Sequence, residues 1–511
     1  MPDTLSKKFQ VNVAQQFKES FDEGDPTQMY LFYARIDPWA NESIPDTIAD
    51  TETAQRQVWR GMTALKKVSN NNVTMSVTKY LWQSNTIYTE FRDNDAAIPT
   101  SNFYVINSNN EVYKCLFNNN GARSIVSPSG TSTSTITTSD GYKWKFLYDV
   151  SQADFVRFGS ANFIPVQTLR SNDGSAQWAV QQAAANGAIP IYEVTSGGTG
   201  YLENRGIFDG ITSTTQLKVA NTASDTDNVY NGSSLFISSG LGAGQIRVIT
   251  GYNATTKLVT VNNAFSVSPN TSSTYHIGPR INITGDGNGA SAYANVHNGV
   301  VQKITAINLG SSYSLAKVGI SANPTYGSGA TATAYLPPVG GHGSDPVTEL
   351  YAQNVTLNVE IDGSEGGFFP ANNQFRIFGL LKDPTLRSTG GVADGLRYDQ
   401  TMRLTVSSVS GTYAQDEFIT GGTSGARGRV VYFANTNLAG TQGVLHLTYK
   451  DGNFSNSEVI TANSTGVTSQ ITNITLPDLV PFSGSMLYMV TQAPLERDAD
   501  QTENFTITVK F

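Results

Sequence analysis

The chain has 511 residues, of which only 14% are charged, and it is rich in Gly (47), Tyr (23) and Phe (24). Its formal net charge of -8 and the lack of any Lys/Arg cluster argue against a nucleic-acid partner, because phosphate neutralisation needs clustered cations. No run approaches eighteen apolar residues, so we expect no membrane insertion, and the single Cys115 excludes an intramolecular disulfide.

The length exceeds that of one hydrophobic core, and the composition is typical of β-rich chains. We therefore predict a mainly β protein of several parts. Its scaffold is a layered β-sandwich with a few loop helices, in the ranges 1–187, 338–403 and 477–511. Two inserted all-β modules, 188–337 and 404–476, interrupt this scaffold.

The scaffold begins with a predicted helix over 8–22, because Phe9, Val13, Phe17 and Phe21 recur every four residues. A β-like run from Met29 to Ile36 follows and ends at Asp37-Pro38, with Trp39 on the next loop. A second helix is predicted over 51–67, with Asp50 or Thr51 as its cap. Its apolar face consists of Val58, Met62 and Leu65.

Strands are predicted over 73–80, 103–106 and 111–117, and the last two form a hairpin joined through Ser108-Asn109-Asn110. Cys115 lies in the second of these strands, and we expect it to be buried rather than reactive. A further strand over 142–150 has one strongly aromatic face. That face consists of Tyr142, Trp144, Phe146, Tyr148 and Val150. A sugar-binding platform has such aromatic residues, but we expect core or subunit contacts.

The module 188–337 contains short strands punctuated by Gly, with an internal echo between Gly287–Ala294 and Gly327–Ala334. A meander over 242–265 places Asn253 in the turn, with Val248 and Val259 in opposing strands. The two Gly-rich runs precede strands and lack a following Lys-Ser/Thr, so we interpret them as turns and not as phosphate loops.

Histidines are sparse in the chain, and no metal site is predicted. His342 lies in a Gly-rich loop with Asp345 as its nearest possible ligand, and we expect a hydrogen-bonded loop histidine. The other three, His276, His297 and His446, are scattered over different predicted strands. We predict no catalytic residue and no cofactor.

The module 404–476 contains a second echo, in which Gly411–Gly425 recurs as Gly452–Gly466, with Glu417 recurring as Glu458. A duplicated hairpin is the simplest explanation. In the closing range 477–511, Met486–Val490 is a continuous apolar run, typical of a strand covered on both faces. Strand residues Phe505, Ile507, Val509 and Phe511 then alternate with polar residues, so we expect the last strand to be covered on one face and to pair near the N-terminus.

Five scaffold segments together resemble a known family. Leu31–Glu42, Glu111–Ala122, Ser139–Val150, Asn372–Pro384 and Gly484–Phe511 are similar, in order and type of element, to the baseplate wedge subunit called gene product eight in T4-like contractile-tailed bacteriophages. The resemblance covers more than half of the chain. The two inserted modules have no equivalent in that subunit.

The resemblance implies a structural virion protein of the tail baseplate, assembled in the host cytoplasm, with a layered β-sandwich. It implies a homodimer that contacts other baseplate wedge proteins and helps to transmit the contraction trigger. Trp39, Tyr142, Trp144, Tyr148, Phe505 and Phe511 are the candidate assembly or core contacts.

Two other function classes compete with a structural virion role. A glycoside hydrolase needs two positioned carboxylates, but the densest acidic group, Glu496, Asp498, Asp500 and Glu503, lies on a turn where solvated acids are ordinary. We therefore expect no enzyme. A tail fibre or glycan-binding receptor protein is the stronger alternative, because its Gly/Ser/Thr-rich β modules would look like the insertions.

Overall fold

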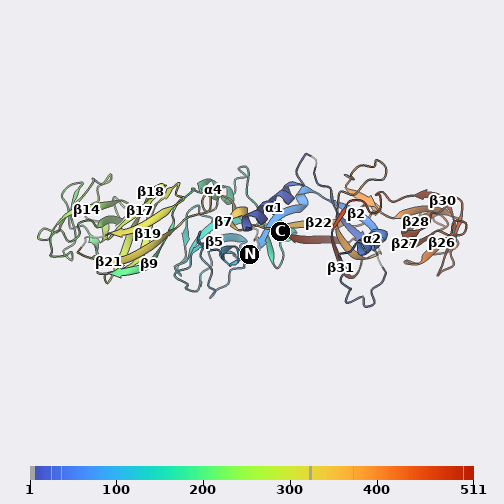
Figure 1. Ribbon diagram of the computed structural model, residues 1–511, viewed down its shortest axis with the longest axis horizontal. Coiled ribbons are helices and arrows are strands. Elements are labelled where there is room, and N and C mark those ends of the chain that lie inside the picture. Colours follow the sequence, from blue (N-terminus) through green and yellow to red (C-terminus); the bar gives the residue numbers. More distant parts are fainter. Residues whose placement is uncertain (1–5, 25, 36, 322–324, 372, 499) are drawn as a thin grey trace. The chain divides into compact units, whose positions relative to one another are not determined.

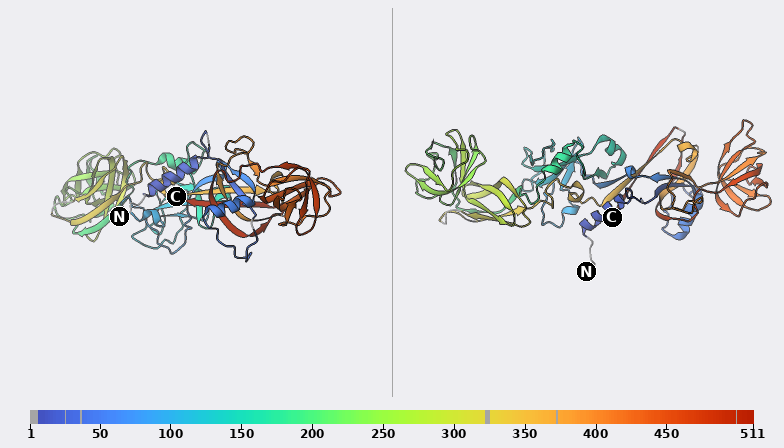
Figure 2. Two further views of the ribbon diagram at one scale, coloured as in Figure 1. Left: turned by 45° about the vertical axis from the view of Figure 1, so that its right-hand side comes forward. Right: turned by 90° about the horizontal axis from the view of Figure 1, so that it is seen from above.

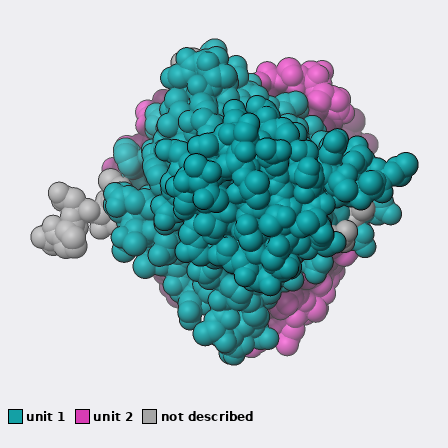
Figure 3. Space-filling model, turned by 90° about the vertical axis from the view of Figure 1, so that its right-hand side faces the viewer, with its two compact units in different colours: residues 1–76, 156–159, 353–511 teal, residues 77–155, 160–352 magenta. Residues whose placement is uncertain are grey.

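The computed structural model describes residues 6–24, 26–35, 37–321, 325–371, 373–498 and 500–511. Its contacts divide the chain into two compact units (Figure 3): unit 1 lies in 1–76, 156–159 and 353–511, and unit 2 in 77–155 and 160–352. Antiparallel strands dominate both (Figures 1 and 2), so the predicted mainly β class is confirmed. The predicted boundaries near 188, 338, 404 and 477 define smaller pieces than these units and stay predictions.

The first sheet of unit 1 has β1 at its centre, where every side chain from Met29 to Ala34 is buried. Ile36, at the end of the predicted strand, lies outside the described residues. The outermost strands of this sheet are β24 and β31. In spatial order the strands are β24 (Arg397–Asp399), β2 (Met62–Val68), β1 (Met29–Ala34), β23 (Gln374–Lys382) and β31 (Ser485–Glu496).

The C-terminal strand β32 (Thr502–Lys510) pairs over its whole length with β22 (Asn354–Asp362), which in turn pairs with β3 (Val73–Thr78). The expected burial of one face is confirmed for Phe505 and Ile507. The partner is different from the expected one, because β22 stands between β32 and the N-terminal strand β3. Phe505 packs on Tyr33 and Phe378, so it joins β32 to the first sheet through an aromatic core.

The two predicted helices are shorter in the structure. Helix α1 (Lys7–Glu19) is capped by Ser6 and buries Val11 and Ala14, whereas Phe9 is 50% exposed. Helix α2 (Glu52–Gly61) is capped by Thr51 as predicted, but Met62 and Leu65 belong to β2. The change occurs at Gly61, where a side chain would overlap the carbonyl oxygen of Arg35. Pairing of β2 with β1 therefore overrides the local helical pattern.

Six further strands of unit 1 close a barrel between Met402 and Thr475 (Figure 1), within which the predicted duplicated hairpin lies. The two copies contribute β26 and β29, which pair antiparallel with Thr420 opposite Thr461. An approximate two-fold axis thus relates the copies. Around the barrel the strands are β25 (Met402–Ser407), β28 (Gly443–Asp451), β27 (Arg427–Asn435), β26 (Phe418–Gly421), β29 (Val459–Ala462) and β30 (Thr468–Thr475).

Unit 2 begins with a four-stranded sheet that contains the predicted hairpin, now β4 and β5, with Val105 opposite Tyr113. Cys115 is fully buried in β5, which confirms that expectation, and burial raises the pKa of its thiol well above the usual value. The strands in order are β4 (Tyr104–Ile106), β5 (Glu111–Phe117), β7 (Lys143–Asp149) and β6 (Ile136–Thr137).

A six-stranded sheet of unit 2 explains the Gly-rich echo. A side chain at Gly287 would overlap the ring of Tyr313, and one at Gly327 would overlap the ring of Tyr201. Gly287 and Gly327 therefore each lie against the ring of a tyrosine from another segment of the chain. The strands in order are β19 (Val300–Ser311), β18 (Asn288–His297), β17 (Arg280–Gly285), β20 (Ala316–Ser321), β21 (Ser328–Tyr335) and β9 (Ile191–Thr199).

A seven-stranded sheet is inserted in the chain between β9 and β17. Its β14 and β15 form the predicted meander hairpin, but Asn253 pairs with Leu258 at the strand end, and its side chain accepts from Thr256 N inside the turn. Val248 in β14 and Val259 in β15 lie in opposing strands, as predicted, with Val259 opposite Tyr252 and Val248 opposite Ser234 of β13. The strands in order are β10 (Asn204–Ile207), β16 (Thr274–Gly278), β13 (Ser234–Ser239), β14 (Ile246–Asn253), β15 (Leu258–Val261), β12 (Gln216–Lys218) and β11 (Gly210–Ile211).

The remaining elements are short. They are β8 (Phe163–Val166), α3 (Gln152–Phe158), α4 (Ala176–Ala183), α5 (Pro346–Glu349) and the 3₁₀ turns at Asn70–Asn72, Ile98–Thr100 and Glu365–Gly367. Among the helices of the described residues, none has the length and apolar character needed to cross a membrane.

Candidate functional site

The aromatic strand β7 lies in the core of unit 2. Tyr142 and Trp144 are fully buried and stack with ring centroids 5.4 Å apart, and the Tyr142 hydroxyl donates to Ala122 O at 2.5 Å. Tyr148 does not share their face. Phe146 lies opposite Tyr113 while Tyr148 lies opposite Val112, so the register shifts between them and turns Tyr148 to the other side, where its hydroxyl donates to Pro165 O.

The other three candidate residues lie in unit 1. Phe505 is in the aromatic core, and the ring of Phe511 lies 5.2 Å from that of Phe17 in α1. Trp39 is half-buried, and its Nε1 donates to Gln492 O of β31 at 3.1 Å. Four of the six candidates are therefore buried core residues, and the partly exposed Trp39 points to β31.

Strand β31 is the outer strand of its sheet and carries exposed apolar side chains. Leu487 is 51% exposed, Tyr488 is 39% exposed, and Phe482, just before the strand, is 55% exposed. The prediction of cover on both faces is therefore wrong for this run. In the described part of the chain, β23 is the only strand with which β31 pairs.

The expectation that the acidic residues near the C-terminus are all solvated is wrong for one of them. Glu496, Asp498 and Asp500 are exposed, but Glu503 is 8% exposed and forms an ion pair with buried Arg497 at 2.7 Å. Arg497 also donates to the backbone oxygens of Phe369 and Gly363. This pair therefore fixes the chain between β31 and β32.

A buried charged cluster surrounds His342 in unit 2. Lys114 forms an ion pair with Glu349 at 2.9 Å, and both side chains are buried. Glu349 also accepts from Gly343 N at 2.6 Å, which holds the loop that carries His342. The expected hydrogen bonding of His342 is wrong at Nδ1, which is buried and makes no hydrogen bond within the described residues. Burial, with Lys114 and Lys145 nearby, lowers its pKa well below the usual value.

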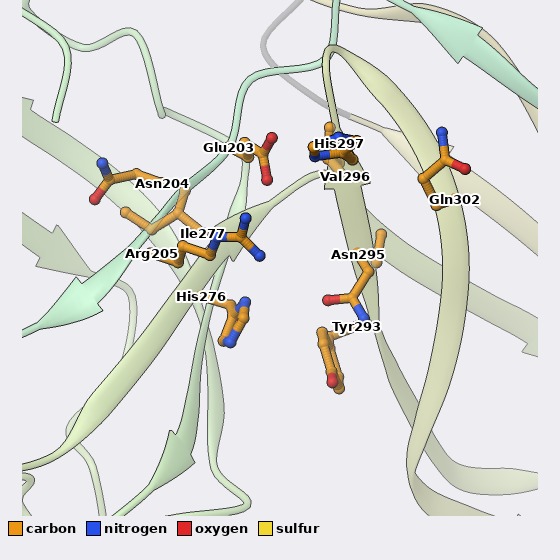
Figure 4. A pocket seen from close by; sticks show the side chains of 11 residues that line it. Glu203, Asn204, Arg205, His276, Ile277, Tyr293, Asn295, Val296, His297 and Gln302 are labelled. Atoms are coloured by element: carbon orange, nitrogen blue, oxygen red, sulfur yellow. The ribbon is translucent and has the colours of Figure 1, made fainter. Parts of the chain in front are cut away.

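A polar pocket of about 280 Å³ lies between the seven-stranded and six-stranded sheets of unit 2 (Figure 4). One wall is formed by β10 and β16, where Arg205 pairs directly with His276. The other wall is β18, whose alternate residues Tyr293, Asn295 and His297 face outward while Ala294 and Val296 face the core. Residues of both sheets thus face each other across the pocket.

Two further polar side chains complete the lining. Glu203 precedes β10, and Gln302 lies in β19 at a register shift, because Asn295 pairs with Lys303 while Val296 pairs with Val301. Such a bulge redirects the side chain of the extra residue. Figure 4 shows Arg205 and Asn295 projecting into the space between the walls.

Packing between the two sheets gives the pocket a fixed floor. The rings of Phe236 in β13 and Tyr293 in β18 stack with centroids 4.2 Å apart and an interplanar angle of 17°. Gly278 approaches Ala294 O so closely that a side chain would collide with it. These contacts join the sheets without using the polar groups of the pocket.

Asn204 and His297 bond to neighbouring side chains, Tyr275 and Asn298, but four other polar side chains of the pocket lack a partner within the described residues. The side chains of Glu203, Arg205, His276 and Asn295 make no hydrogen bond or ion pair within the described residues. Burial lowers the pKa of His276, Arg205 lowers it further and Glu203 opposes them, so the imidazole is neutral near pH 7. Donors and acceptors are therefore available to a ligand.

The sequence reasoning missed this pocket. His276 and His297 were described as scattered, yet β16 and β18 bring both to one site. The available signal was the alternation Tyr293, Asn295, His297 on the face of β18 opposite its small core residues. In the described residues, no group of three His, Cys, Asp or Glu side chains is placed to hold a metal ion.

Comparisons with known proteins give little guidance. No protein-family model matches the chain. No curated protein matches it either. Among solved structures, a chain titled "Virion of native gene transfer agent (GTA) particle" is 11% identical, with 52% of this chain and 83% of that chain covered, at a TM-score of 0.15. A TM-score this low does not establish a shared fold.

Proposed function

We propose that this chain is a structural protein of a phage-like virion, and more specifically a subunit of a tail baseplate wedge that holds neighbouring wedge proteins together. The resemblance of its scaffold segments to the T4-like wedge subunit supports this proposal. The observation that carries it in the structure is the open, apolar outer strand β31.

An open outer strand without charged side chains is a template on which another strand can pair. Natural sheets protect their edges with charged residues, proline or covering elements, because unpaired N–H and C=O groups recruit other strands. From Ser485 to Leu495, β31 has no charged side chain, and Leu487 and Tyr488 are exposed. Pro494 interrupts only the far end. An added strand from another subunit would bury these side chains and pair the free backbone groups.

We propose a second copy of β31 as the first such partner. A two-fold axis beside β31 would place the same residues of both copies against one another, as an isologous interface requires. The resemblance, which implies a homodimer, agrees with this choice. Other baseplate wedge proteins would then use the remaining surface, within a virion tail assembled in the host cytoplasm.

Light scattering on the full chain tests self-association. We expect a dimer at micromolar concentration, and Leu487→Lys to shift it to monomer because a charge at an apolar interface is costly. Leu438→Lys is the matched control, since Leu438 is fully exposed in a barrel loop. A wild-type chain that stays monomeric, or a dimer that survives Leu487→Lys, contradicts the β31 interface.

Imaging of intact particles with a label on this chain tests its place in the virion. We expect the label at the baseplate, around the central hub. A label at fibre tips supports the second candidate, a receptor-binding fibre protein, which the polar pocket of unit 2 favours. A label absent from particles removes both.

We further propose that the chain has no enzymatic activity. Its purified form is expected to leave cell-wall polysaccharide and peptidoglycan intact above buffer rates. Turnover that a single carboxylate substitution abolishes would overturn this proposal.

A further inference from the structure

The pocket of unit 2 is lined by polar side chains that can both donate and accept hydrogen bonds. Its side chains provide both donors and acceptors: the Arg205 guanidinium donates, the Glu203 carboxylate accepts, and the amides of Asn295 and Gln302 do both. A neutral imidazole at His276 likewise donates once and accepts once. A ligand that matches this set must also donate and accept at several positions.

The charges of the pocket argue against an ion as the ligand. Arg205 and Glu203 both line the cavity, and both act on His276, with opposite effects on its pKa. Their formal charges cancel. An anion would meet the Glu203 carboxylate, and a cation would meet the Arg205 guanidinium. A neutral ligand avoids both conflicts.

The size and walls of the pocket narrow the ligand further. Its volume of about 280 Å³ is just below the range for drug-sized ligands, which begins near 300 Å³, so the ligand must be small. The ring of Tyr293, held by its stack on Phe236, provides an apolar wall beside the polar groups. A ring with several hydroxyl groups and an apolar C–H face fits this combination.

From these observations we infer that the pocket between β10, β16 and β18 binds one neutral sugar ring. Arg205 and Asn295 would bind hydroxyl groups from opposite walls, and Glu203 would accept from a third. This inference goes beyond a structural role in the virion. A baseplate protein that binds no sugar would retain the proposed function, and a sugar-binding chain outside the baseplate would retain this inference.

Binding is measured on the full chain by saturation-transfer NMR and calorimetry. The probes are the methyl glycosides of glucose, galactose, mannose, fucose and N-acetylglucosamine. We expect at least one to bind with a Kd on the order of 1 mM, as is usual for a ligand of this size. Binding of none of these probes to the folded chain overturns the inference.

Variants connect the binding to the pocket. Arg205→Ala and Asn295→Ala are each expected to weaken it at least tenfold, since each removes donors from one wall. The matched controls are Lys317→Ala and Asn308→Ala, exposed residues of the six-stranded sheet that do not line the pocket, which should leave binding unchanged. Equal effects of pocket and control variants, or no effect of either pocket variant, overturn the inference.

Charged probes distinguish a neutral ligand from an anion. Inorganic phosphate and N-acetylneuraminic acid should bind more weakly than the best neutral glycoside. The substitution Glu203→Gln should not strengthen the binding of that glycoside. Preferred binding of an anion that Glu203→Gln strengthens would assign the pocket to anions and overturn the inference. Circular dichroism on each variant confirms that the fold is intact.

Discussion

Glu417 and Glu458 each bind the turn that belongs to the other's copy of the duplicated hairpin. Glu417 accepts from Thr465 N at 3.1 Å and from Thr465 Oγ1 at 3.0 Å. Glu458 accepts from Ser424 N at 3.0 Å and from Ser424 Oγ at 2.9 Å. Both carboxylates are buried, and the paired strands β26 and β29 lie between them. The exchange holds the two copies together.

Removing either carboxylate should therefore loosen both turns. We expect Glu417→Ala and Glu458→Ala each to lower the free energy of unfolding of the barrel by about 1–3 kcal/mol, because buried N–H groups lose their acceptor. Chemical denaturation, with hydrogen exchange at Ser424 and Thr465 as the local probe, measures this. If Glu458→Ala affected only its own copy's turn, the exchange would be structurally unimportant.

The carboxylate of Glu458 makes the stability of the barrel sensitive to acid. Burial raises the pKa of Glu458, but hydrogen bonds led by that from Ser424 N outweigh it and hold the pKa below the usual 4.5. A carboxyl with a lowered pKa stabilises the fold above its unfolded pKa, and that contribution is lost as the pH falls through the folded pKa. Stability measured between about pH 5 and pH 3 should fall less in Glu458→Gln than in wild type. Glu496→Gln, at an exposed carboxylate, is the control.

The tyrosine rings that pack against Gly287 and Gly327 predict how substitutions of these glycines change the stability of unit 2. Gly287→Ala and Gly327→Ala should each destabilise unit 2 by about 1–3 kcal/mol, because the new methyl group meets the ring of Tyr313 or Tyr201. At Gly287 it also meets Ser311 O, and at Gly327 the φ of +86° adds backbone strain. Gly319→Ala, whose methyl group would meet only Asn282 at ordinary distance, is the control. Thermal unfolding compares the three, and equal melting temperatures would show that the rings move aside without cost.

The buried pair in unit 2 predicts strong coupling. Lys114→Met alone should cost about 3–5 kcal/mol, because Glu349 is left buried without a counter-charge. The double variant Lys114→Met/Glu349→Gln should cost less, since Gln keeps an acceptor for Gly343 N. A double-mutant cycle by urea denaturation measures the coupling. Additive effects would mean that the two charges act independently.

The aromatic core of unit 1 predicts a large effect at one C-terminal residue. Phe505→Ala should destabilise unit 1 by about 3–5 kcal/mol, because Tyr33 and Phe378 lose their partner across the two sheets. Asn504→Ala on the exposed face of β32 is the control. Hydrogen exchange in β22 and β32 measures the difference, and similar protection in both variants would contradict this packing.

Local pattern was sufficient wherever neighbours in sequence are neighbours in space. The hairpin around Asn110 and the duplicated hairpin of the barrel were predicted because turn and strand residues lie close along the chain. Helix α2 was overextended for the opposite reason. Met62 and Leu65 continue a helical pattern, but strand β1, thirty residues upstream, recruits them into the sheet.

The sequence did not predict that β31 would be an exposed outer strand, or that residues from distant strands would meet in one pocket. Met486–Val490 is as apolar as a central strand, and only the pairing order shows it to be the outer one. The pocket joins Arg205, His276 and Asn295 from strands that are distant along the chain. Periodicity assigns a residue to a face of its own strand, but it does not show which other strand will stand opposite.

The pairing of β9 with β21 also sets an order of events during synthesis. Ile191 lies opposite Tyr335, and the seven-stranded sheet is encoded between them. At about 5–20 residues per second, β9 leaves the ribosome roughly 7–30 seconds before its partner exists. The intervening strands meet their partners sooner, so β9 and the cover of Tyr201 over Gly327 are completed late. A nascent chain stalled before residue 328 should therefore have a folded seven-stranded sheet but an unprotected β9.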